Sequence, residues 1–546
     1  MEALIKQFVG QFVGKKIGIL FCLILINITP LRATPITQVD GVDVVEQWGI
    51  FEVALDGPSD GNPFLDVQLS AQFTNGVITT NVDGFYDGAG KYKIRFMPQH
   101  TGQWRFITQS NRWSLTAKKG NFEAVVPTKD NHGPVGVVNT FHFAYADGTP
   151  FKQIGTTSYT WTHRPAEVEQ QTLDTLANSP FNKLRFCVFP QTHGIETMPP
   201  QRFPFAGEPT KPDYSRFNPA FFQHLENHVD NLRQLNIEAD LILLQPYDDK
   251  HIWGLDNMPA EVEDRYLRYI VARLAAYRNI WWSMANEYDF LRTKTEADWD
   301  RIFQVVQQAD PYDHLRSIHN GKKIYNNTKP WVTHASIQNG FAVTNPGTAQ
   351  LYRDVYNKPI VYDEVEYEGN HGSRWAQLSG KELVHRFWSG TVVGTYVGHS
   401  EFLVEANDPS SFVWLGQGGI LKGESPVRLA FLRQILEDSP AEGIEPIDKW
   451  WNPNIGGQAG EYYLIYFGHE RLNQWQFALP PVGLTEGDEF KVEVIDTWNM
   501  TIEPVAGVFK VKRDGRYHFR DINNKQVKLP KKTGLALRIK RISNAN

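Results

Sequence analysis

The chain has very little cysteine and no marked excess of charge. Of its 546 residues only Cys22 and Cys187 are cysteines, and Cys22 lies in an apolar N-terminal run, so no disulfide is expected in a processed chain. The formal net charge is -6 and no basic cluster stands out, which argues against a nucleic-acid-binding protein. Stability must therefore come from apolar cores, and the length suffices for two or three domains.

Long apolar runs are also scarce. The run Ile17–Ile28 follows Lys6, Lys15 and Lys16, and Ala33 is a candidate cleavage site after it. This pattern is typical of a secretory signal peptide. The run is short for a membrane span, although a retained signal anchor is the alternative. We predict a signal peptide over residues 1–33 and an exported protein, periplasmic or secreted, with no stable membrane span after cleavage.

Two kinds of hydrophobic pattern divide the rest of the chain. Short alternating runs between Gly and Asn fill residues 37–127 and predict a β-sandwich. Over 138–440, apolar runs alternate with amphipathic stretches, as in βα units around a parallel sheet. Alternating strands return over 442–546 and predict a small C-terminal all-β domain. The predicted fold class is α/β with two flanking β domains.

Eight apolar runs in the middle segment have the length of buried strands. Eight strands joined by helices predict a (β/α)8 TIM barrel, whose active site gathers at the C-terminal strand ends. The runs are Phe151–Tyr159, Asn182–Pro190, Glu238–Asp248, Asn279–Glu287, Leu315–Asn320, Trp331–Gln338, Lys358–Glu364 and Gly394–Glu401.

Polar and aromatic side chains follow almost every one of these runs. In a barrel such side chains face one cavity. The predicted substrate-binding residues are Tyr159, Trp161, His163, Arg185, Gln245, Tyr247, Asp248, Asn286, His319, His334, Gln338, His399 and Glu401.

Two carboxylates at these ends suit glycosidic bond cleavage. Glu287 ends the fourth run and Glu364 closes the seventh, and strands 4 and 7 lie across a barrel mouth from one another. Cleavage with retention needs one carboxyl to protonate the leaving oxygen and a second, about 5 to 5.5 Å away, to attack the anomeric carbon. Burial and a second carboxylate keep the acid protonated by raising its pKa; Trp281 or Trp282 is expected to supply the apolar wall.

The seventh run offers several carboxylates. Asp363, Glu366 and Glu368 compete with Glu364 for the role. Strand alternation predicts that Tyr362 and Glu364 point to one side and Asp363 to the other, and we therefore favour Glu364.

The strand ends carry a resemblance to a known group of enzymes. "ANE" at 285–287 and "KPIVYDE" at 358–364, with Arg185 on the second strand, resemble the signature of clan A glycoside hydrolases, which are retaining (β/α)8 enzymes. "GTTSYTWTH", "FNKLRFCVFP" and "DEVEYEG" resemble the apiosidase-like branch of those barrels. The flanking domains are similar to β modules that accompany this branch in bacterial proteins. The Asn-Glu pair departs from apiosidases, so the resemblance does not imply specificity for apiose.

The resemblance implies four roles. Glu287 would be the general acid/base and Glu364 the nucleophile, while Asn286 would hold the sugar 2-hydroxyl and Arg185 would keep Glu364 ionised. From the residues alone, Glu287 could also be a solvated loop carboxylate and Arg185 a structural ion-pair partner.

Four histidines near strand ends raise the alternative of a metal site: His163, His319, His334 and His399. However, "YTWTHRP" lacks the His-x-His that commonly opens a metal-dependent barrel hydrolase, and the chain has no HExxH and no paired cysteines. We therefore expect neither a metal nor a cofactor, and predict that His334 and His399 donate hydrogen bonds to sugar hydroxyls or to the carboxylates.

Aromatic residues make up 13% of the chain and include 16 Trp. Flat rings suit sugar faces, although core packing explains most single cases. The candidate subsite walls are Tyr159, Trp161, Tyr247, Trp253, Tyr288, Tyr367 and Trp414.

These patterns predict an exported, cofactor-independent, retaining glycoside hydrolase. Its partner would be an oligo- or polysaccharide of plant, algal or microbial origin rather than a nucleic acid. Two alternatives stay open: a carbohydrate-binding protein on a barrel that has lost its activity, and a metal-dependent barrel hydrolase.

Overall fold

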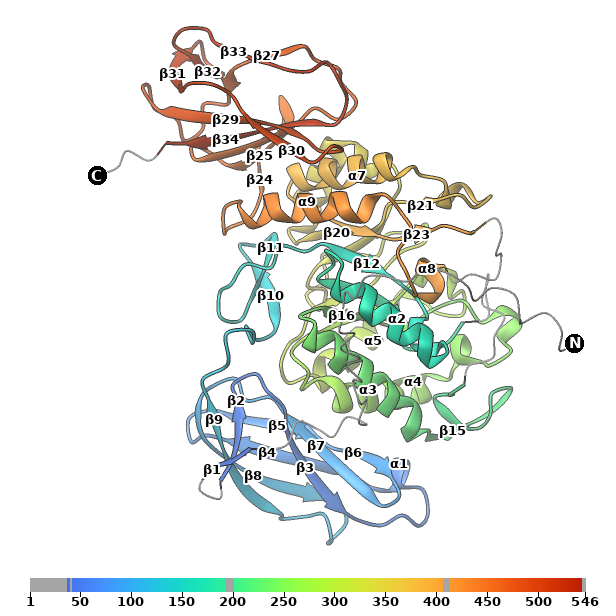
Figure 1. Ribbon diagram of the computed structural model, residues 1–546. Coiled ribbons are helices and arrows are strands. Elements are labelled where there is room, and N and C mark those ends of the chain that lie inside the picture. The colour runs from blue at the N-terminus through green and yellow to red at the C-terminus, as the bar shows by residue number, and fades with distance from the viewer. Residues whose placement is uncertain (1–36, 40–41, 192–200, 406–412, 543–546) are drawn as a thin grey trace, which may run out of the picture. The chain divides into compact units, whose positions relative to one another are not determined.

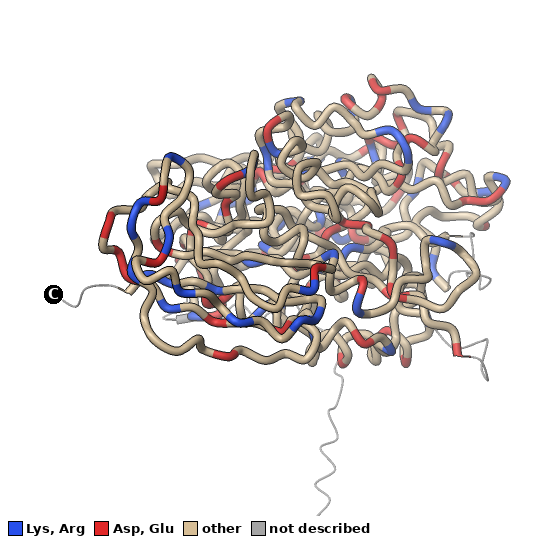
Figure 2. Tube along the Cα trace, turned by 90° about the horizontal axis from the view of Figure 1, so that it is seen from above, with Lys and Arg blue, Asp and Glu red and all other residues tan. Residues whose placement is uncertain are grey.

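The computed structural model describes residues 37–39, 42–191, 201–405 and 413–542. The predicted signal peptide lies outside these residues. Within them, no helix combines the length and the apolar character that crossing a membrane would require. Lys and Arg are interspersed with Asp and Glu along the described chain (Figure 2).

The N-terminal domain is a sandwich of two β-sheets. The larger sheet has the order β1-β2-β9-β8-β4-β5 and the smaller β3-β7-β6 (Figure 1). Inward-facing aromatic residues fill the space between them: the rings of Phe51 and Phe122 stack 4.0 Å apart, and those of Phe73 and Phe96 stack 4.2 Å apart. The elements are β1 (Thr37–Val39), β2 (Val42–Glu46), β3 (Phe51–Asp56), α1 (Pro63–Asp66), β4 (Leu69–Thr74), β5 (Thr79–Asp83), β6 (Phe85–Gly88), β7 (Lys91–Phe96), β8 (Gly102–Ser110) and β9 (Lys119–Val125).

The middle domain is an eight-stranded parallel barrel. Its strand order is β18-β17-β16-β13-β12-β22-β20-β19, and a parallel bridge between His319 and Ser336 links the two outer strands. All eight predicted strands are present, and the predicted fold class is confirmed. They are β12 (Gly155–Thr157), β13 (Lys183–Cys187), β16 (Glu238–Leu244), β17 (Ile280–Ala285), β18 (Arg316–Ser317), β19 (Ala335–Gln338), β20 (Ile360–Glu364) and β22 (Tyr396–His399).

Amphipathic helices surround the strands (Figure 1). Their ends follow the usual capping chemistry: Asn218 caps α3 ahead of a first-turn proline, and Thr295 and Asp298 form a capping box on α5. The principal helices are α2 (Ala166–Ala177), α3 (Pro219–Gln234), α4 (Ala260–Leu274), α5 (Glu296–Ala309), α6 (Pro346–Tyr356), α7 (Gly380–Val392) and α9 (Ser425–Glu437). Shorter elements on the connections are η1 (Trp161–His163), β14 (Phe205–Glu208), β15 (Lys211–Phe217), η4 (Tyr288–Phe290), β21 (Glu368–Gly369), β23 (Glu401–Phe402) and α8 (Trp414–Gln417).

A hairpin closes the N-terminal end of the barrel. Phe143, on the hairpin of β10 (Val135–Val138) and β11 (His142–Tyr145), packs with Phe151, Trp281, Leu315 and Val361 in one buried apolar cluster. This cluster is called the bottom plug below.

The predicted side-chain alternation in β20 is wrong. Ser336 of β19 pairs with Val361, but Gln338 pairs with Glu364, so β20 holds one extra residue at this point. Such a bulge breaks the period of two. Tyr362 therefore packs in the apolar core toward the helices, while Asp363 and Glu364 both contact groups inside the barrel.

The C-terminal domain is all-β and has its own apolar core. Its main sheet has the order β24-β25-β26-β34-β29-β31-β32-β28, with β30 beside β29. The strands are β24 (Glu445–Asp448), β25 (Asn452–Gln458), β26 (Tyr462–Tyr466), β27 (Gln474–Gln476), β28 (Ala478–Leu479), β29 (Glu489–Asp496), β30 (Thr501–Pro504), β31 (Phe509–Asp514), β32 (His518–Asp521), β33 (Gln526–Lys528) and β34 (Leu535–Arg541).

Buried ion pairs link the N-terminal sandwich to the barrel. Arg273 of α4 is 1% exposed and contacts Asp87 of β6 at 2.6 Å and Glu226 of α3 at 2.5 Å. Arg95 of β7 lies 2.8 Å from Glu226. One hydrophobic cluster also runs from the sandwich core into the barrel's helix layer, so the two domains share a continuous interior.

Candidate active site

A closed ring of polar contacts lies at the C-terminal ends of the barrel strands. It joins two carboxylates, Glu287 after β17 and Glu364 at the end of β20, along two separate routes. Its members, in order, are Glu287, Gln338, His319, Glu364, Arg185, Asn286 and Tyr247.

The first route runs through an amide and an imidazole. Gln338 Nε2 donates to Glu287 Oε1 at 3.0 Å, and its Oε1 lies 3.1 Å from His319 Nε2. The same Nε2 lies 3.4 Å from Glu364 Oε1. Both neighbours of this nitrogen are therefore acceptors, so His319 Nε2 acts as a donor here.

The second route runs through a guanidinium. Arg185 donates from Nη1 to Glu364 Oε1 at 3.3 Å and from Nη2 to Asn286 Oδ1 at 2.5 Å. Asn286 Nδ2 donates to the Tyr247 hydroxyl at 2.8 Å, and that hydroxyl donates to Glu287 Oε2. Each carboxylate is thus held by more than one group, which limits the positions it can take.

The two carboxyl groups have opposite electrostatic environments. Burial and the neighbouring Glu364 raise the pKa of Glu287, because both disfavour a second negative charge. Burial also opposes ionisation of Glu364, but His319, Arg185 and the Tyr159 hydroxyl outweigh it and hold its pKa well below the usual value. The surroundings therefore favour the protonated form of Glu287 and the ionised form of Glu364.

The backbone at Glu287 is unusual. Its φ of 43° and ψ of 50° place it in the left-handed region, which costs a non-glycine residue roughly 1–3 kcal/mol. Tyr288 N donates to the His319 carbonyl, and Asp289 accepts from the backbone N–H groups of Gly321, Lys322 and Lys323 at 2.6–2.9 Å. These bonds tie the β17 end to the β18 end and hold Glu287 in its strained position.

A buried charge cluster lies beneath Glu364, inside the barrel. Lys183 Nζ is 2.8 Å from both Asp240 Oδ2 and Asp363 Oδ1. Ser336 Oγ donates to Asp363 at 2.5 Å and lies 2.9 Å from His319 Nδ1. Because the serine proton goes to Asp363, His319 Nδ1 must donate to the serine oxygen. Both ring nitrogens of His319 therefore face oxygen atoms, one of which belongs to Glu364.

Sequence reasoning missed Lys183 and Asp240 as supporting residues. Lys183 stands two positions before Arg185 in an otherwise apolar strand, and Asp240 interrupts "EADLILL". A charge inside a buried strand requires a partner, so these interruptions are the signal that could have revealed both residues.

Three of the aromatic candidates lie at the ring. Tyr159 donates to Glu364 and lies beside Tyr247, with the ring centroids 6.4 Å apart. The Tyr367 hydroxyl interacts with both Glu364 and Tyr159. Half-buried Trp375 stands next to Tyr367, with centroids 6.5 Å apart. Trp375 is an aromatic residue that sequence reasoning did not single out.

Other predicted site residues lie elsewhere. The side chains of Trp161, Trp253, Trp414 and Tyr288 are buried in apolar clusters, and none of these side chains has a described contact with the ring. Trp282 belongs to the same core, its Nε1 donating to Asp310, and Trp281 belongs to the bottom plug. Neither tryptophan supplies the apolar wall expected beside the acid. The reason is that the wide apolar layer between strands and helices accommodates most large rings.

Three predicted histidines are also separate from the ring. His334 packs against Phe143 and Trp281 at the bottom plug. His399 contacts Thr156 and stacks on Phe181. His163 stacks on Phe221 of α3. These three histidines pack among apolar and aromatic side chains, so their position near strand ends does not bring them to the ring.

The remaining predicted polar residues have local structural partners. Gln245 donates to the Pro190 carbonyl at 3.0 Å and accepts from Tyr247 N. Asp248 accepts from the backbone N–H groups of Trp253 and Leu255, and Glu401 accepts from those of Lys422 and Gly423. They shape the loops around the barrel mouth.

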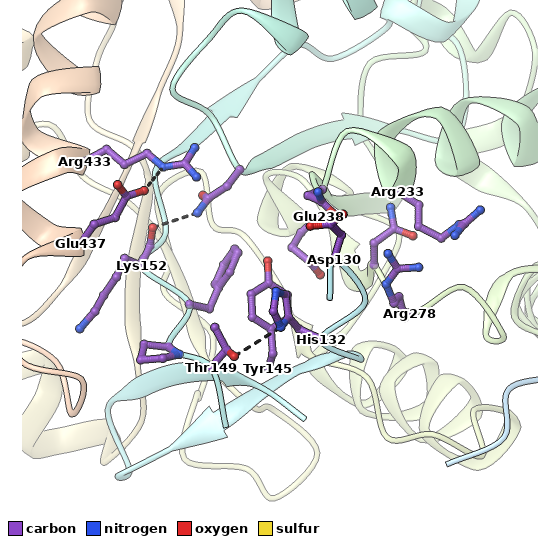
Figure 3. Close-up of a pocket in the computed structure, with 15 residues that line it drawn as sticks. Asp130, His132, Tyr145, Thr149, Lys152, Arg233, Glu238, Arg278, Arg433 and Glu437 are labelled. Carbon is purple, nitrogen blue, oxygen red and sulfur yellow. Dashed lines mark hydrogen bonds and ion pairs between the residues drawn. The ribbon is translucent and has the colours of Figure 1, made fainter. Parts of the chain in front are cut away.

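A separate pocket of about 220 Å³ lies at the N-terminal ends of the strands. Figure 3 shows Arg233, Arg278 and Glu238 on one side and Arg433 with Glu437 on the other. Burial raises the pKa of Glu238, the first residue of β16, to about 8. In barrel enzymes this end contributes to stability while the chemistry lies at the opposite end, so the ring is the better candidate for the active site.

Family models match all three domains. Residues 138–400 match the apiosidase-like catalytic domain, and residues 44–111 and 450–540 match two domains of unknown function, DUF5060 and DUF5605. No curated protein matches the chain significantly.

Two solved structures illustrate the similarity. A protein of Bacteroides vulgatus, described as a candidate glycoside hydrolase, is 40% identical over 92% of this chain and 100% of its own, with a TM-score of 0.88. A family 5 glycoside hydrolase of Bacteroides vulgatus is 13% identical over 77% of this chain and 95% of its own, with a TM-score of 0.57. The second match concerns the fold alone.

Proposed function

The chain belongs to the apiosidase-like glycoside hydrolases, and from this premise we propose that it cleaves O-glycosidic bonds of an oligo- or polysaccharide with retention of anomeric configuration. The expected N-terminal signal adds a second proposal, that the enzyme acts after export, in the periplasm or outside the cell. The glycan would be of plant, algal or microbial origin.

The proposed reaction has two displacements. Glu364 attacks the anomeric carbon while Glu287 transfers its proton to the leaving oxygen, which gives a covalent glycosyl-enzyme and a free alcohol. Glu287, now ionised, takes a proton from water, and the resulting hydroxide displaces Glu364. The sugar leaves with its original configuration, and both carboxyl groups return to their first protonation states.

The observation that carries this proposal is the opposite shift of two linked carboxyl pKa values. A general acid must be protonated and a nucleophile ionised at the same pH. Glu287 has the raised pKa and Glu364 the lowered one. Exchanging the two roles would require Glu364 to be protonated and Glu287 to be ionised, and each state is opposite to the direction of that group's pKa shift.

The other ring members have supporting roles in this scheme. Arg185 and His319 favour the ionised form of Glu364, and Tyr159 donates to the same carboxylate. Asn286 is placed by Arg185 on one side and Tyr247 on the other, and we assign its second amide N–H to a sugar hydroxyl next to the reacting carbon. Tyr367 and Trp375 are proposed subsite walls.

Substitution of the two carboxylates tests the proposal. We expect Glu364→Gln and Glu287→Gln each to lower kcat on a cleaved polysaccharide by at least about 10³-fold, since each removes an essential group. The matched control is Glu261→Gln, an exposed glutamate at the start of α4, which should keep full activity. Full activity in either site variant would contradict the assignment.

Azide separates the two roles. Added to Glu287→Gln with an activated aryl glycoside, azide should restore turnover and give a glycosyl azide with the substrate's configuration, because azide needs no general base. An inverted product at first turnover of the unsubstituted enzyme would exclude double displacement. Glycan binding with no turnover on any substrate would favour the carbohydrate-binding alternative.

A further inference from the structure

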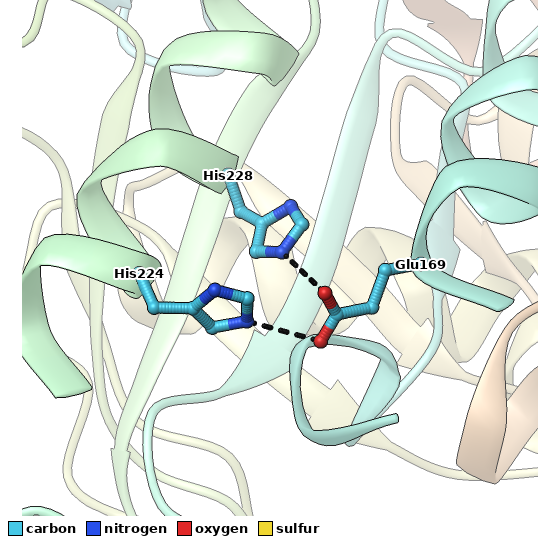
Figure 4. A group of neighbouring side chains, drawn as sticks. All are labelled: Glu169, His224 and His228. Atoms are coloured by element: carbon cyan, nitrogen blue, oxygen red, sulfur yellow. Dashed lines mark hydrogen bonds and ion pairs between the residues drawn. The ribbon is translucent and has the colours of Figure 1, made fainter. Parts of the chain in front are cut away.

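A His-Glu-His cluster lies outside the barrel, in the layer of helices. Figure 4 shows Glu169 of α2 facing His224 and His228 of α3. Glu169 Oε1 is 3.0 Å from His224 Nε2, and its Oε2 is 3.1 Å from His228 Nε2. One ligand atom from each residue lies within 4.8 Å of the other two.

The sequence spacing explains this convergence. His224 and His228 are four residues apart, so they project from one face of α3 on successive turns. Their Nε2 atoms point to the same carboxylate, which comes from the neighbouring helix. The carbonyl oxygen of Thr162 in η1 lies 3.1 Å from His224 Nε2 and is a further possible oxygen ligand for a metal.

The cluster is largely shielded from solvent. The side chains of Glu169 and His228 are 6% and 7% exposed, and that of His224 is 20% exposed.

A second buried histidine points to a missing ligand at the same place. The Nε2 atom of His163 has no hydrogen-bond partner among the described residues. Its ring is bonded to the backbone of Val188, and since Nε2 is unpartnered that bond belongs to Nδ1.

His163 and His224 line one small cavity. Its volume is about 10 Å³, and Thr162, Phe221 and Leu225 also border it. That is about enough for a single water molecule. A water here would satisfy His163 Nε2 and could occupy an open coordination position beside His224.

We propose that Glu169, His224 and His228 bind a divalent transition metal, with zinc the best fit, and that the fourth ligand is a water or carbonyl on the side of His163 and Thr162. Two imidazoles, one carboxylate and one open position are a common zinc donor set. Bonds of about 2.0–2.2 Å require ligand atoms roughly 3.2–3.5 Å apart, and the two carboxylate–imidazole distances of 3.0 and 3.1 Å lie within a few tenths of an ångström of that separation.

The metal would be structural. It would link α2 to α3 and, through the contact of His224 with the Thr162 carbonyl, fix the position of η1. The η1 helix begins just after Tyr159, whose hydroxyl donates to Glu364. The site belongs to the helix layer and not to the strand ends, so the ion would take no part in the proposed displacement. Loss of activity on chelation would then reflect loss of stability and not a metal-dependent mechanism.

Metal analysis of the full chain tests the proposal. The protein, prepared without a histidine tag, is stripped with a chelator, incubated with Zn²⁺, freed of excess ion and assayed by mass spectrometry. We expect about one zinc per chain and a Tm about 2–5 °C above that of the stripped protein. Cobalt in place of zinc should give visible absorption typical of coordination by nitrogen and oxygen in a site of four or five ligands.

Two variants and one control locate the ion. Glu169→Gln keeps the size of the side chain, and His224→Gln changes a side chain that is 20% exposed, so both are expected to fold. Each should bring the bound zinc below about 0.2 per chain and abolish the Tm shift. His469→Gln is the control, because Glu382, His385 and His469 form the other cluster of suitable donors in the described chain.

The outcomes are decisive in both directions. Zinc retained by the control and lost in both variants supports the site. No retained zinc in the unsubstituted protein overturns it, and so does zinc that survives both variants or disappears only with His469→Gln. None of these results depends on finding the glycan substrate.

Discussion

At the scale of single residues, the active site depends on opposite pKa shifts of two glutamate side chains, Glu287 and Glu364. Glu287 and Glu364 share a hydrogen-bonded ring, yet Arg185 and His319 lie within ion-pair distance of Glu364 and, in the described structure, not of Glu287. The strand-end pattern in the sequence pointed to all seven members of the ring, because polar residues after buried strands must face the barrel mouth. It could not distinguish His319 from His399, since both follow apolar runs and only the three-dimensional neighbours differ.

The first residue-scale prediction concerns pH dependence. Activity needs Glu364 ionised, so it should fall as pH drops through the lowered pKa of Glu364, below the usual carboxyl range. Activity also needs Glu287 protonated, so it should fall as pH rises through the raised pKa of Glu287. A plot of kcat/KM against pH should therefore be bell-shaped with an extended acid side. A steep loss of activity above the usual carboxyl range on the acid side would contradict this assignment.

His319→Gln should narrow that profile. Glutamine can still donate to Glu364 but carries no charge, so the pKa of Glu364 should rise and the acid limb should move to higher pH. We expect kcat/KM at neutral pH to fall about 10–100-fold. The control is His399→Gln, which removes another buried histidine that has no described contact with the ring. An acid limb that moves equally in both variants would argue against a specific effect of His319.

At the scale of elements, the bulge in β20 decides how the site is built. A regular strand would send Asp363 away from Glu364, and this is what the sequence pattern predicted. The extra residue instead turns both side chains inward, so that Asp363 pairs with Lys183 while Glu364 reaches the mouth. Bulges depend on pairing between strands distant in sequence, so local patterns could not reveal this one.

The neighbouring strand constrains that bulge. A Cβ on Gly398 of β22 would lie 2.5 Å from the Asp363 carbonyl oxygen and 3.0 Å from its Cα. We therefore expect Gly398→Ala to displace the β20 backbone and to lower kcat by about 10- to 100-fold, because small shifts of a nucleophile are costly. Gly372→Ala is the control, with nothing within 4 Å of the added carbon. Similar kcat values in both variants would show that β20 is not constrained by Gly398.

At the scale of the whole molecule, the sandwich and the barrel share an interior. The composition predicted separate cores, because domain-sized segments with different periodicities usually fold independently. The structure instead shows one apolar cluster extending across both, together with the buried pairs of Arg273, Asp87 and Glu226. Contacts between domains leave no periodic signal, which is why the sequence did not reveal them.

Arg273→Met tests this shared interior. Removal of the guanidinium leaves Asp87 with Lys93 and Gln223 as its remaining partners and Glu226 with Arg95. Loss of one partner of a buried ion pair typically costs about 3–5 kcal/mol, and these remaining contacts should hold the cost at or below that range. Urea unfolding followed by fluorescence should show a lower midpoint for the sandwich and the barrel together. Arg433→Met, which breaks a partly exposed pair with Glu437, should cost less than about 1 kcal/mol. A midpoint shift confined to one domain would mean that the two unfold independently.

The bottom plug has a consequence for the order of events in the proposed reaction. Because Phe143 and its neighbours fill the N-terminal end of the barrel, reactants and products must all use the mouth at the other end. The departing alcohol and the incoming water then compete for the same passage above Glu287. A second sugar that lingers at this mouth can accept the glycosyl group in place of water, so synthesis of new glycosidic linkages should accompany hydrolysis when acceptor sugars are abundant.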